Sequence, residues 1–242
     1  MTRLPDAQTI RERIGRVMER IYDAGKRSGR NPEEIRLVLV TKTHPVETIQ
    51  AAIVAGARYL GENYAEEAVG KIQAVREPHD LEWHMIGHVQ SRKADLVCQH
   101  FHYLHSLDSL KLAIRLNRFL QEQGRILPAL LECNTSGEST KYGWEIVRED
   151  QWGNLLAELR EVVDLSNLKV QGLMTMAPFL ESPEQARPFF NRLRRFQAFL
   201  KKNIPQISWT ELSMGMSSDF EVAVEEGATW VRIGQAILGP RT

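Results

Sequence analysis

The chain has 242 residues, of which 43% are hydrophobic and 26% are charged, which suits one sizeable core and an ordinary charged surface. Its 31 basic residues balance 31 acidic ones, so the zero formal net charge argues against a main partner that is nucleic acid. The two cysteines, Cys98 and Cys133, are too few for a disulfide framework, and no stretch resembles a signal peptide or a membrane span. We therefore expect a cytoplasmic protein with no membrane partner.

The predicted elements begin with an amphipathic helix over residues 6–29, whose apolar residues recur at helical spacing and whose Asp6 caps the first turn. The apolar β-branched run at 37–41 then predicts a strand that is buried on both faces. A helix over 45–55 follows and ends at Gly56. A long helix followed by a buried strand and a second helix is typical of an α/β protein.

Strands and helices alternate along the rest of the chain. The further predicted strands lie near 57–61, 82–86, 102–106, 127–133, 169–174, 208–213 and 229–233. The further predicted helices lie near 64–76, 90–98, 109–122, 144–162, 184–202 and 217–226. Eight strands, each followed by a helix or helical turn, predict an α/β fold with a single (β/α)8 TIM barrel and an extra N-terminal helix. No linker divides the chain, so residues 1–242 are expected to form one domain, and an open doubly wound sheet would normally use fewer strands.

Polar and unusual residues lie at the carboxyl-terminal ends of the predicted strands or just after them, where the loops of a barrel form one common face. In chain order they are Lys42, Asn63, His84, Gly87, Ser106, Asn134, Met174, Met176, Ser213, Ser217, Ser218, Arg232 and Gly234. Each position alone is weak evidence, but their shared placement at strand ends indicates a functional site at the barrel mouth.

Lys42 is the candidate nucleophile because it ends an apolar strand at that mouth. Desolvation between low-dielectric walls lowers the pKa of a lysine and makes its neutral amine available to attack a carbonyl. The alternative is a lysine whose stem covers the strand end while its ammonium reaches water. The rest of the predicted site favours the first interpretation, a Schiff base on Lys42.

The C-terminal segment has the pattern of a phosphate cradle. Ser218 and Glu221 have capping-box spacing, which would turn Ser217 and free backbone N–H groups toward the mouth. Gly234 lets the backbone come close to a ligand, and the N–H groups of Gly234 and Gln235 are candidate donors. Barrels often bind phosphate between the loops after strands seven and eight, so we expect phosphate there; ordinary capping and a tight turn are the alternative.

Arg232 lies inside the last apolar strand and therefore needs a buried partner. One candidate is a ring nitrogen, such as the pyridine nitrogen of pyridoxal 5′-phosphate (PLP), which enzymes pair with Asp or Arg. An arginine always donates, so it would leave that nitrogen unprotonated and a poor electron sink. The alternative is a structural ion pair to Glu211. Cys98 and the histidines His100, His102 and His105 do not complete a familiar metal site, so no metal is expected.

The residues and motifs together closely resemble the YggS/PROSC family of pyridoxal phosphate homeostasis proteins over about residues 5–241. The strings that carry the resemblance are LVLVTKTHP, GARYLGENYAEE, LEWHMIGHVQSRK, HSLDS, CNTSGESTKYGW, GLMTMAP and LSMGMSSDFEVAVEEGATWVRIGQAILG. Strings of this length make chance agreement implausible.

The resemblance implies PLP as the cofactor and assigns cofactor-binding roles to nine residues. These are Lys42, Asn63, His84, Met174, Ser213, Ser217, Arg232, Gly234 and Gln235. Lys42 matches the Schiff-base lysine and Arg232 the arginine beside the pyridine nitrogen, whereas His84, Met174 and Ser213 match wall positions. Relatives often carry Thr where Gln235 stands, so the backbone donor is kept but a hydroxyl contact to phosphate is not. Relatives also often carry Pro at His88.

The family's barrel is similar to that of alanine racemase, which implies a choice between a carrier and an enzyme. Such racemases take their second base from a separate domain, for which this sequence leaves no residues after Thr242, and neither Tyr64 nor Tyr142 lies in the context of an activated base. We therefore expect a non-enzymatic protein of intracellular PLP (vitamin B6) homeostasis that holds PLP on Lys42 without efficient turnover. The alternative is a PLP-dependent enzyme, such as an amino-acid racemase or deaminase.

A third reading is a Schiff-base aldolase that uses the same cradle for a sugar phosphate. The position of Lys42 on the first strand and the presence of Arg232 favour PLP instead. The resemblance implies PLP-dependent apoenzymes as protein partners, and a barrel that closes on itself is expected to be a monomer or a weak dimer.

Overall fold

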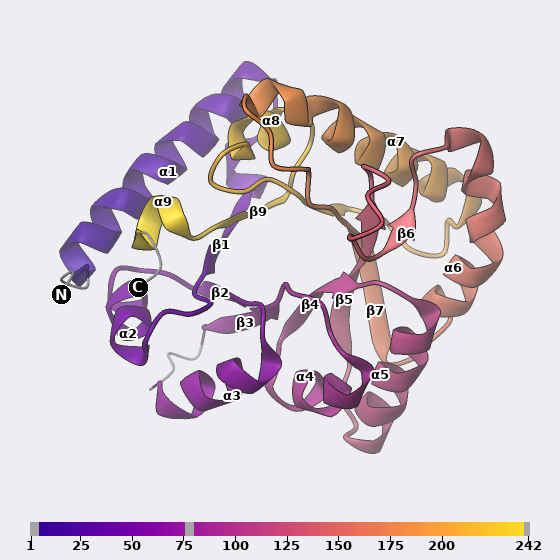
Figure 1. The fold of residues 1–242 in the computed structure, drawn as a ribbon, viewed down its shortest axis with the longest axis horizontal. Helices are drawn as coiled ribbons and strands as arrows, with labels where there is room; N and C mark the ends of the chain where they lie inside the picture. The colour runs from indigo at the N-terminus through magenta and orange to yellow at the C-terminus, as the bar shows by residue number, and fades with distance from the viewer. Residues whose placement is uncertain (1–4, 76–79, 240–242) are drawn as a thin grey trace.

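The computed structural model describes residues 5–75 and 80–239, which form a closed parallel β-barrel surrounded by helices (Figure 1). The barrel strands are β1 (Arg36–Val40), β2 (Tyr59–Glu62), β3 (Glu82–Met85), β4 (Tyr103–Leu107), β5 (Leu127–Asn134), β7 (Leu168–Met174), β8 (Glu211–Ser213) and β9 (Trp230–Ile233). Neighbouring strands pair in the order β4-β3-β2-β1-β9-β8-β7-β5, and a β4–β5 pairing closes the ring. This closure confirms the predicted TIM barrel.

Helices lie outside the barrel and alternate with its strands (Figure 1). They are α1 (Ala7–Arg27), α2 (Val46–Val54), α3 (Ala65–Ala74), α4 (Ala94–His100), α5 (Leu110–Glu122), α6 (Leu156–Val163), α7 (Arg187–Asn203), α8 (Phe220–Glu225) and α9 (Gln235–Leu238). The 3-10 turns are η1 (Pro32–Glu34), η2 (Ser91–Lys93), η3 (Glu149–Leu155) and η4 (Pro183–Ala186). Among the described residues, no helix combines the length and apolar character needed to cross a membrane.

Local signals set the first helices as the sequence predicts. The Asp6 side chain accepts a hydrogen bond from Thr9 N at 2.8 Å and so caps α1. Helix α2 ends at Val54, and Gly56 follows with a φ of 108°, a left-handed conformation that glycine adopts without steric cost. The last residue of the predicted helix 64–76 lies outside the described residues.

Two local predictions are wrong. The predicted helix over 144–162 starts instead as a short strand, β6 (Trp144–Glu145), which pairs with β5 before η3 and α6 begin. The predicted capping box of Ser218 and Glu221 is absent because α8 begins later, at Phe220, and the loop is closed by Asp219, whose Oδ1 accepts from Met216 N at 2.6 Å. An Asp can close its own turn in this way, which the capping-box pattern does not reveal.

The core has two parts separated by the barrel wall. The larger part packs helices against the outside of the strands and includes Phe190, Phe196 and Trp209. The smaller part fills the barrel interior with Val38, Ile86, Tyr103, Leu130, Met174 and Trp230. Because successive strand residues face opposite sides, each strand serves both parts, and its carboxyl end presents residues to one open mouth.

Candidate functional site

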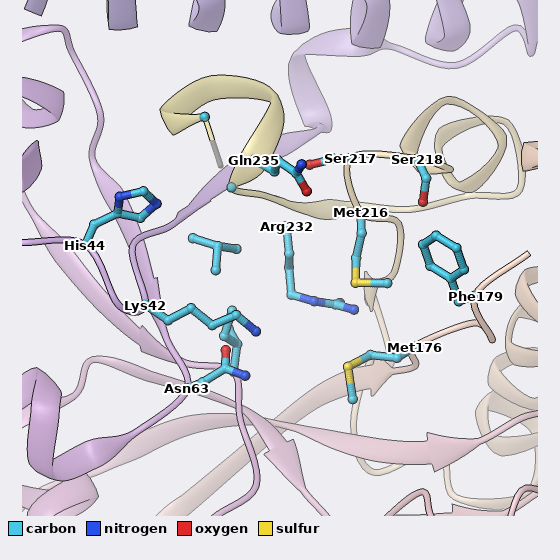
Figure 2. Close-up of a pocket in the computed structure, with 14 residues that line it drawn as sticks. Lys42, His44, Asn63, Met176, Phe179, Met216, Ser217, Ser218, Arg232 and Gln235 are labelled. Atoms are coloured by element: carbon cyan, nitrogen blue, oxygen red, sulfur yellow. The ribbon is translucent and has the colours of Figure 1, made fainter. Parts of the chain in front are cut away.

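A cavity of about 500 Å³ opens at the mouth where the parallel strands end (Figure 2). Its lining residues are Val40, Lys42, His44, Asn63, Ile86, Met176, Phe179, Met216, Ser217, Ser218, Arg232, Gly234, Gln235 and Gly239. Val40 and Arg232 belong to β1 and β9, and the others come from the segments that follow β1, β2, β3, β7, β8 and β9. Six of the nine predicted site residues thus share one cavity, which is large enough for a small cofactor.

Lys42 and Asn63 enter the cavity from neighbouring strands. Strands β1 and β2 pair in parallel with Val40 opposite Gly61. Lys42 and Asn63 each follow two residues later, so they leave the two strands side by side. Figure 2 shows the Lys42 amine and the Asn63 amide close to one another, with Arg232 across from them. The three neighbouring strands β2, β1 and β9 thus bring an amide, an amine and a guanidinium into one cavity.

A buried ion cluster holds the backbone on both sides of Lys42. The Lys71 ammonium donates to the Thr41 carbonyl at 2.9 Å and to Glu62 Oε1 at 2.8 Å, and it lies 2.6 Å from Glu67 Oε1. Thr41 Oγ1 donates to Glu62 at 2.7 Å, and Thr43 N donates to Glu67 at 2.7 Å. Thr43 has a φ of 64°, which a non-glycine residue adopts only when its surroundings impose it.

Charge in this cluster is costly to bury. The Glu62 side chain is fully buried, and its desolvation raises the pKa of the carboxyl, an effect that the neighbouring Lys71 opposes. The Lys71 ammonium also bonds two carboxylates and a carbonyl, so it is held within the cluster. The cluster therefore fixes the loop, and Lys42 is the lysine whose side chain reaches the cavity.

The opposite side of the cavity brings together Ser217, Gly234 and Gln235. The N–H of Ala236 donates to Ser217 Oγ at 3.4 Å, which ties the β8 loop to the start of α9. A Cβ on Gly234 would lie 3.0 Å from the Val40 carbonyl oxygen, so a larger residue there would press on β1. The first N–H groups of a helix have no partner within it, and hydroxyls beside them complete a donor set for an anion.

Arg232 lines the cavity and is otherwise buried, with 4% of its surface exposed. Its Nη1 donates to Ser213 Oγ at 2.6 Å and its Nη2 to the Thr175 carbonyl at 2.9 Å. Burial lowers the pKa of Arg232 to about 10, which leaves it protonated at neutral pH. The alternative ion pair with Glu211 is not formed, because Glu211 pairs with Arg36.

Three predicted site residues, His84, Met174 and Ser213, do not line the cavity. Met174 is fully buried in the apolar barrel interior, while Met176, two residues later, reaches the cavity. His84 and Ser213 face into the barrel below the cavity and are also fully buried. All three lie within the strands themselves, whereas most of the lining residues lie in the segments that follow the strands.

Sequence reasoning missed several lining residues. His44, Ile86, Phe179 and Met216 lie in the cavity wall but were not singled out as candidates. His44 and Met216 each stand within two residues of a predicted site residue, a signal that was available. Phe179 lies on the loop after β7 with 98% of its surface exposed, and only the folded structure places it at this rim.

Glu132 is a further buried carboxyl near Arg232. It shares the inward face of β5 with Leu130, is 4% exposed, and its Oε2 has no hydrogen-bond partner. Desolvation, with a smaller contribution from the charge of Asp108, raises its pKa to about 7, and Arg232 opposes the change. Near neutral pH this group therefore takes up a proton that an exposed glutamate would release.

We expect Glu132→Gln to stabilise the protein relative to wild type as the pH rises. Between pH 4.5 and 7 the folded state binds the Glu132 proton more tightly than the unfolded state, so wild-type stability falls across this window. At about 1.4 kcal/mol for each pH unit, the penalty reaches roughly 3 kcal/mol above pH 7. Denaturant unfolding of both proteins at pH 5 and pH 8 measures it, with the exposed Glu145→Gln as control. A stability difference between Glu132→Gln and wild type that is the same at both pH values would contradict the prediction.

The sequence matches the family described as alanine racemase, N-terminal domain, over residues 16–242. A pyridoxal phosphate homeostasis protein of Aquifex aeolicus is 40% identical over 230 residues, which span 95% of this chain and 97% of the relative. Its counterpart in Escherichia coli K12 is 41% identical over 236 residues, 96% of this chain and 97% of the relative. The similarity therefore extends across the barrel and not over one motif.

Solved structures agree with this comparison. PipY of Synechococcus elongatus PCC7942, solved with PLP bound, is 36% identical and superimposes with a TM-score of 0.81 over 95% of this chain and all of PipY. Alanine racemase of Clostridium difficile 630 is 14% identical, with a TM-score of 0.71 over 95% of this chain and 55% of the racemase. The racemase comparison concerns the fold alone.

Proposed function

Because this chain belongs to the family of pyridoxal phosphate homeostasis proteins, we propose that it binds PLP in the cavity at the barrel mouth and serves intracellular PLP homeostasis. When bound, PLP supplies an aldehyde that condenses with a lysine amine with loss of water. The observation that carries the proposal is the placement of Lys42 and Arg232, which come from the paired strands β1 and β9, in one cavity. PLP attached to Lys42 would thus have its ring beside the Arg232 guanidinium.

The donor set fits the three polar parts of PLP. Lys42 is the amine for the aldehyde, with Asn63 beside it, and we propose that they form a Schiff base and a ring contact respectively. Ser217, Gly234 and Gln235 offer hydroxyl and N–H donors for the phosphate. Arg232, kept protonated and held by two acceptors, is the donor to the ring nitrogen. We assign His84, Met174 and Ser213 to the layer that supports these contacts.

We further propose that the protein is a carrier or regulator of PLP and not an efficient enzyme. A ring nitrogen that accepts from Arg232 stays unprotonated and stabilises a carbanion poorly. Tyr64 and Tyr142 are both more than half exposed, and the Tyr142 ring stacks on His88, so neither has the enclosed surroundings of a tuned base. Residues 1–242 would act in the cytoplasm as one domain, as a monomer or weak dimer, with PLP-dependent apoenzymes as partners.

The proposal is tested by loading the purified protein with PLP, desalting it and recording its visible spectrum. We expect a retained yellow colour, and borohydride followed by peptide mass mapping is expected to place a reduced PLP adduct on the peptide with Lys42. The same sample is expected to show no turnover of amino acids. A colourless protein would refute PLP binding, whereas robust racemisation would refute only the carrier role.

A further inference from the structure

Four polar side chains form a continuous layer inside the barrel, in which Arg232 lines the cavity and the other three lie below it. His84, His105, Ser213 and Arg232 are the second inward-facing residues of β3, β4, β8 and β9, and the first three are fully buried. Branched apolar residues usually fill the interior of such barrels, as Val38 and its neighbours do here. A buried polar layer has to be satisfied by its own hydrogen bonds.

The members of this layer are joined end to end. Arg232 Nη1 lies 2.6 Å from Ser213 Oγ, which lies 2.8 Å from His105 Nδ1. His105 Nε2 lies 2.9 Å from His84 Nδ1. The remaining nitrogen of His84, Nε2, is buried, and Glu82 Oε2 is 3.3 Å away without a well-formed hydrogen bond. The chain thus starts at the cavity and ends at Glu82, the first residue of β3, at the opposite mouth.

Charge and valence restrict the direction of these bonds. Burial lowers the pKa of both histidines, so each ring carries one N–H and one acceptor nitrogen. Arg232 can only donate, which makes Ser213 Oγ an acceptor at that end. Ser213 has one hydroxyl proton, and donating it to His105 Nδ1 gives that proton a partner.

The carboxylate at the far end selects one of the two remaining arrangements. If His84 carries its proton on Nε2, an N–H points toward Glu82; if not, a lone pair faces a negative charge. A proton on His84 Nε2 leaves Nδ1 as an acceptor for His105 Nε2–H, and His105 Nδ1 then accepts from Ser213. Every bond of the chain therefore runs in one direction, from Arg232 to His84, whose Nε2–H lies beside the Glu82 carboxylate.

Neighbouring groups do not interrupt the chain. The Tyr103 ring stacks on His84 with centroids 5.2 Å apart, and its hydroxyl is 2.6 Å from Gln171 Oε1. Trp230 packs against both histidine rings. Arg36 and His102 line the hollow around Glu82 at the far mouth, and Arg36 is paired with Glu211.

We propose that Ser213, His105 and His84 form a one-way hydrogen-bond relay, anchored by Glu82, that positions Arg232 toward the ring nitrogen of the bound cofactor. The carboxylate at the opposite mouth thereby tunes the electronic state of a cofactor in the cavity. This role in positioning rests on the proposed function, but the relay itself is a property of the protein without cofactor. Glu82, His84, His105 and Ser213 are positioning residues because they act through Arg232.

The relay is tested first in the protein without PLP. Long-range ¹H–¹⁵N spectra report which imidazole nitrogen carries the proton, and we expect Nε2–H for both His84 and His105. Glu82→Ala removes the anchoring carboxylate and is expected to convert part of both rings to the other tautomer, whereas Glu82→Gln keeps an acceptor and should preserve the wild-type pattern. An Nδ1–H tautomer in either ring of the wild-type protein would overturn the proposal.

The effect on the cofactor is tested by visible spectra and PLP titration of the same variants. Ser213→Ala is expected to weaken PLP binding about tenfold, the loss of one charge-assisted hydrogen bond. Glu82→Ala is expected to alter the ratio of the absorption bands and weaken binding at least about twofold, with rescue by Glu82→Gln. Unchanged spectra in both variants, with a yellow wild type, overturn the tuning of the cofactor by the relay and leave the proposed function standing. A colourless wild type with the expected tautomers overturns the proposed function and the tuning, and leaves the tautomer assignment standing.

Discussion

Lys42→Ala is expected to abolish the visible absorption that PLP gives to the wild-type protein and to weaken PLP binding at least about a hundredfold, which corresponds to about 3 kcal/mol. The lysine side chain reaches the cavity between Asn63 and Arg232, and its replacement removes the amine for a covalent link. Contacts through Ser217, Gly234 and Gln235 would remain, so weak binding of PLP should persist. Spectra before and after desalting, with equilibrium dialysis for the residual affinity, measure both effects.

Lys42→Arg is the matched control for charge. Arginine keeps a cation of similar length in the cavity but has no primary amine, so a colourless variant with improved residual affinity would separate covalent attachment from electrostatic attraction. Retention of the yellow colour by Lys42→Ala would contradict the assignment and direct attention to another lysine. Lys71, which bonds the Thr41 carbonyl, is then a candidate to examine, although its ammonium is already bonded to two carboxylates.

The barrel was predictable because its signals are local and repeated. Apolar runs such as 37–41 are typical of strands buried on both faces, and the alternation with helices leaves few topologies other than a barrel. Failures occurred where a short segment is decided by its partner. The pairing of Trp144 and Glu145 with the end of β5 makes a strand of residues that have helical periodicity, and only tertiary contact decides between these states.

The sequence predicted that the site lies at the barrel mouth, but it did not predict how deep each side chain lies in the barrel. Placement after a strand identifies Lys42, Asn63 and Arg232 as neighbours, because all parallel strands end at one mouth. Sequence spacing does not say whether a residue stands above or below the rim, and His84 and Ser213 were expected in the wall when they lie one layer beneath it. The ion cluster around Glu62 was invisible for the same reason, since it joins residues from three separate elements.

Lys71→Met is expected to lower the free energy of unfolding by about 3 kcal/mol and the melting temperature by roughly 6–12 °C. Lys71 is 6% exposed, and the variant would leave Glu62 buried without its cation. Breaking one partner of a buried ion pair costs more than the pair contributes as a whole, because the remaining charge stays desolvated. Denaturant unfolding and thermal melts measure the change.

Lys93→Met is the matched control, because Lys93, the last residue of η2, pairs with Glu66 of α3, and both side chains reach solvent. An exposed pair of this kind contributes at most about 1 kcal/mol. Equal losses in the two variants would contradict a special role for the buried cluster. In Lys71→Met the loss of unfolding free energy should also shrink as the pH falls. Burial raises the pKa of Glu62 in the folded state, so the charged carboxylate is destabilising above that pKa, and protonation removes the penalty below it.

The same substitution connects stability to the cofactor site. Lys71 bonds the Thr41 carbonyl, and Glu67 accepts from Thr43 N, so the cluster holds the backbone immediately before and after Lys42. Without Lys71 the left-handed conformation of Thr43 has one constraint fewer, and Lys42 is expected to spend less time in the geometry that binds PLP. Lys71→Met should therefore weaken PLP binding as well as folding. Lys93→Met should change neither, and weakened binding in that control would indicate that general loosening of the barrel mouth, and not the clamp on Lys42, is responsible.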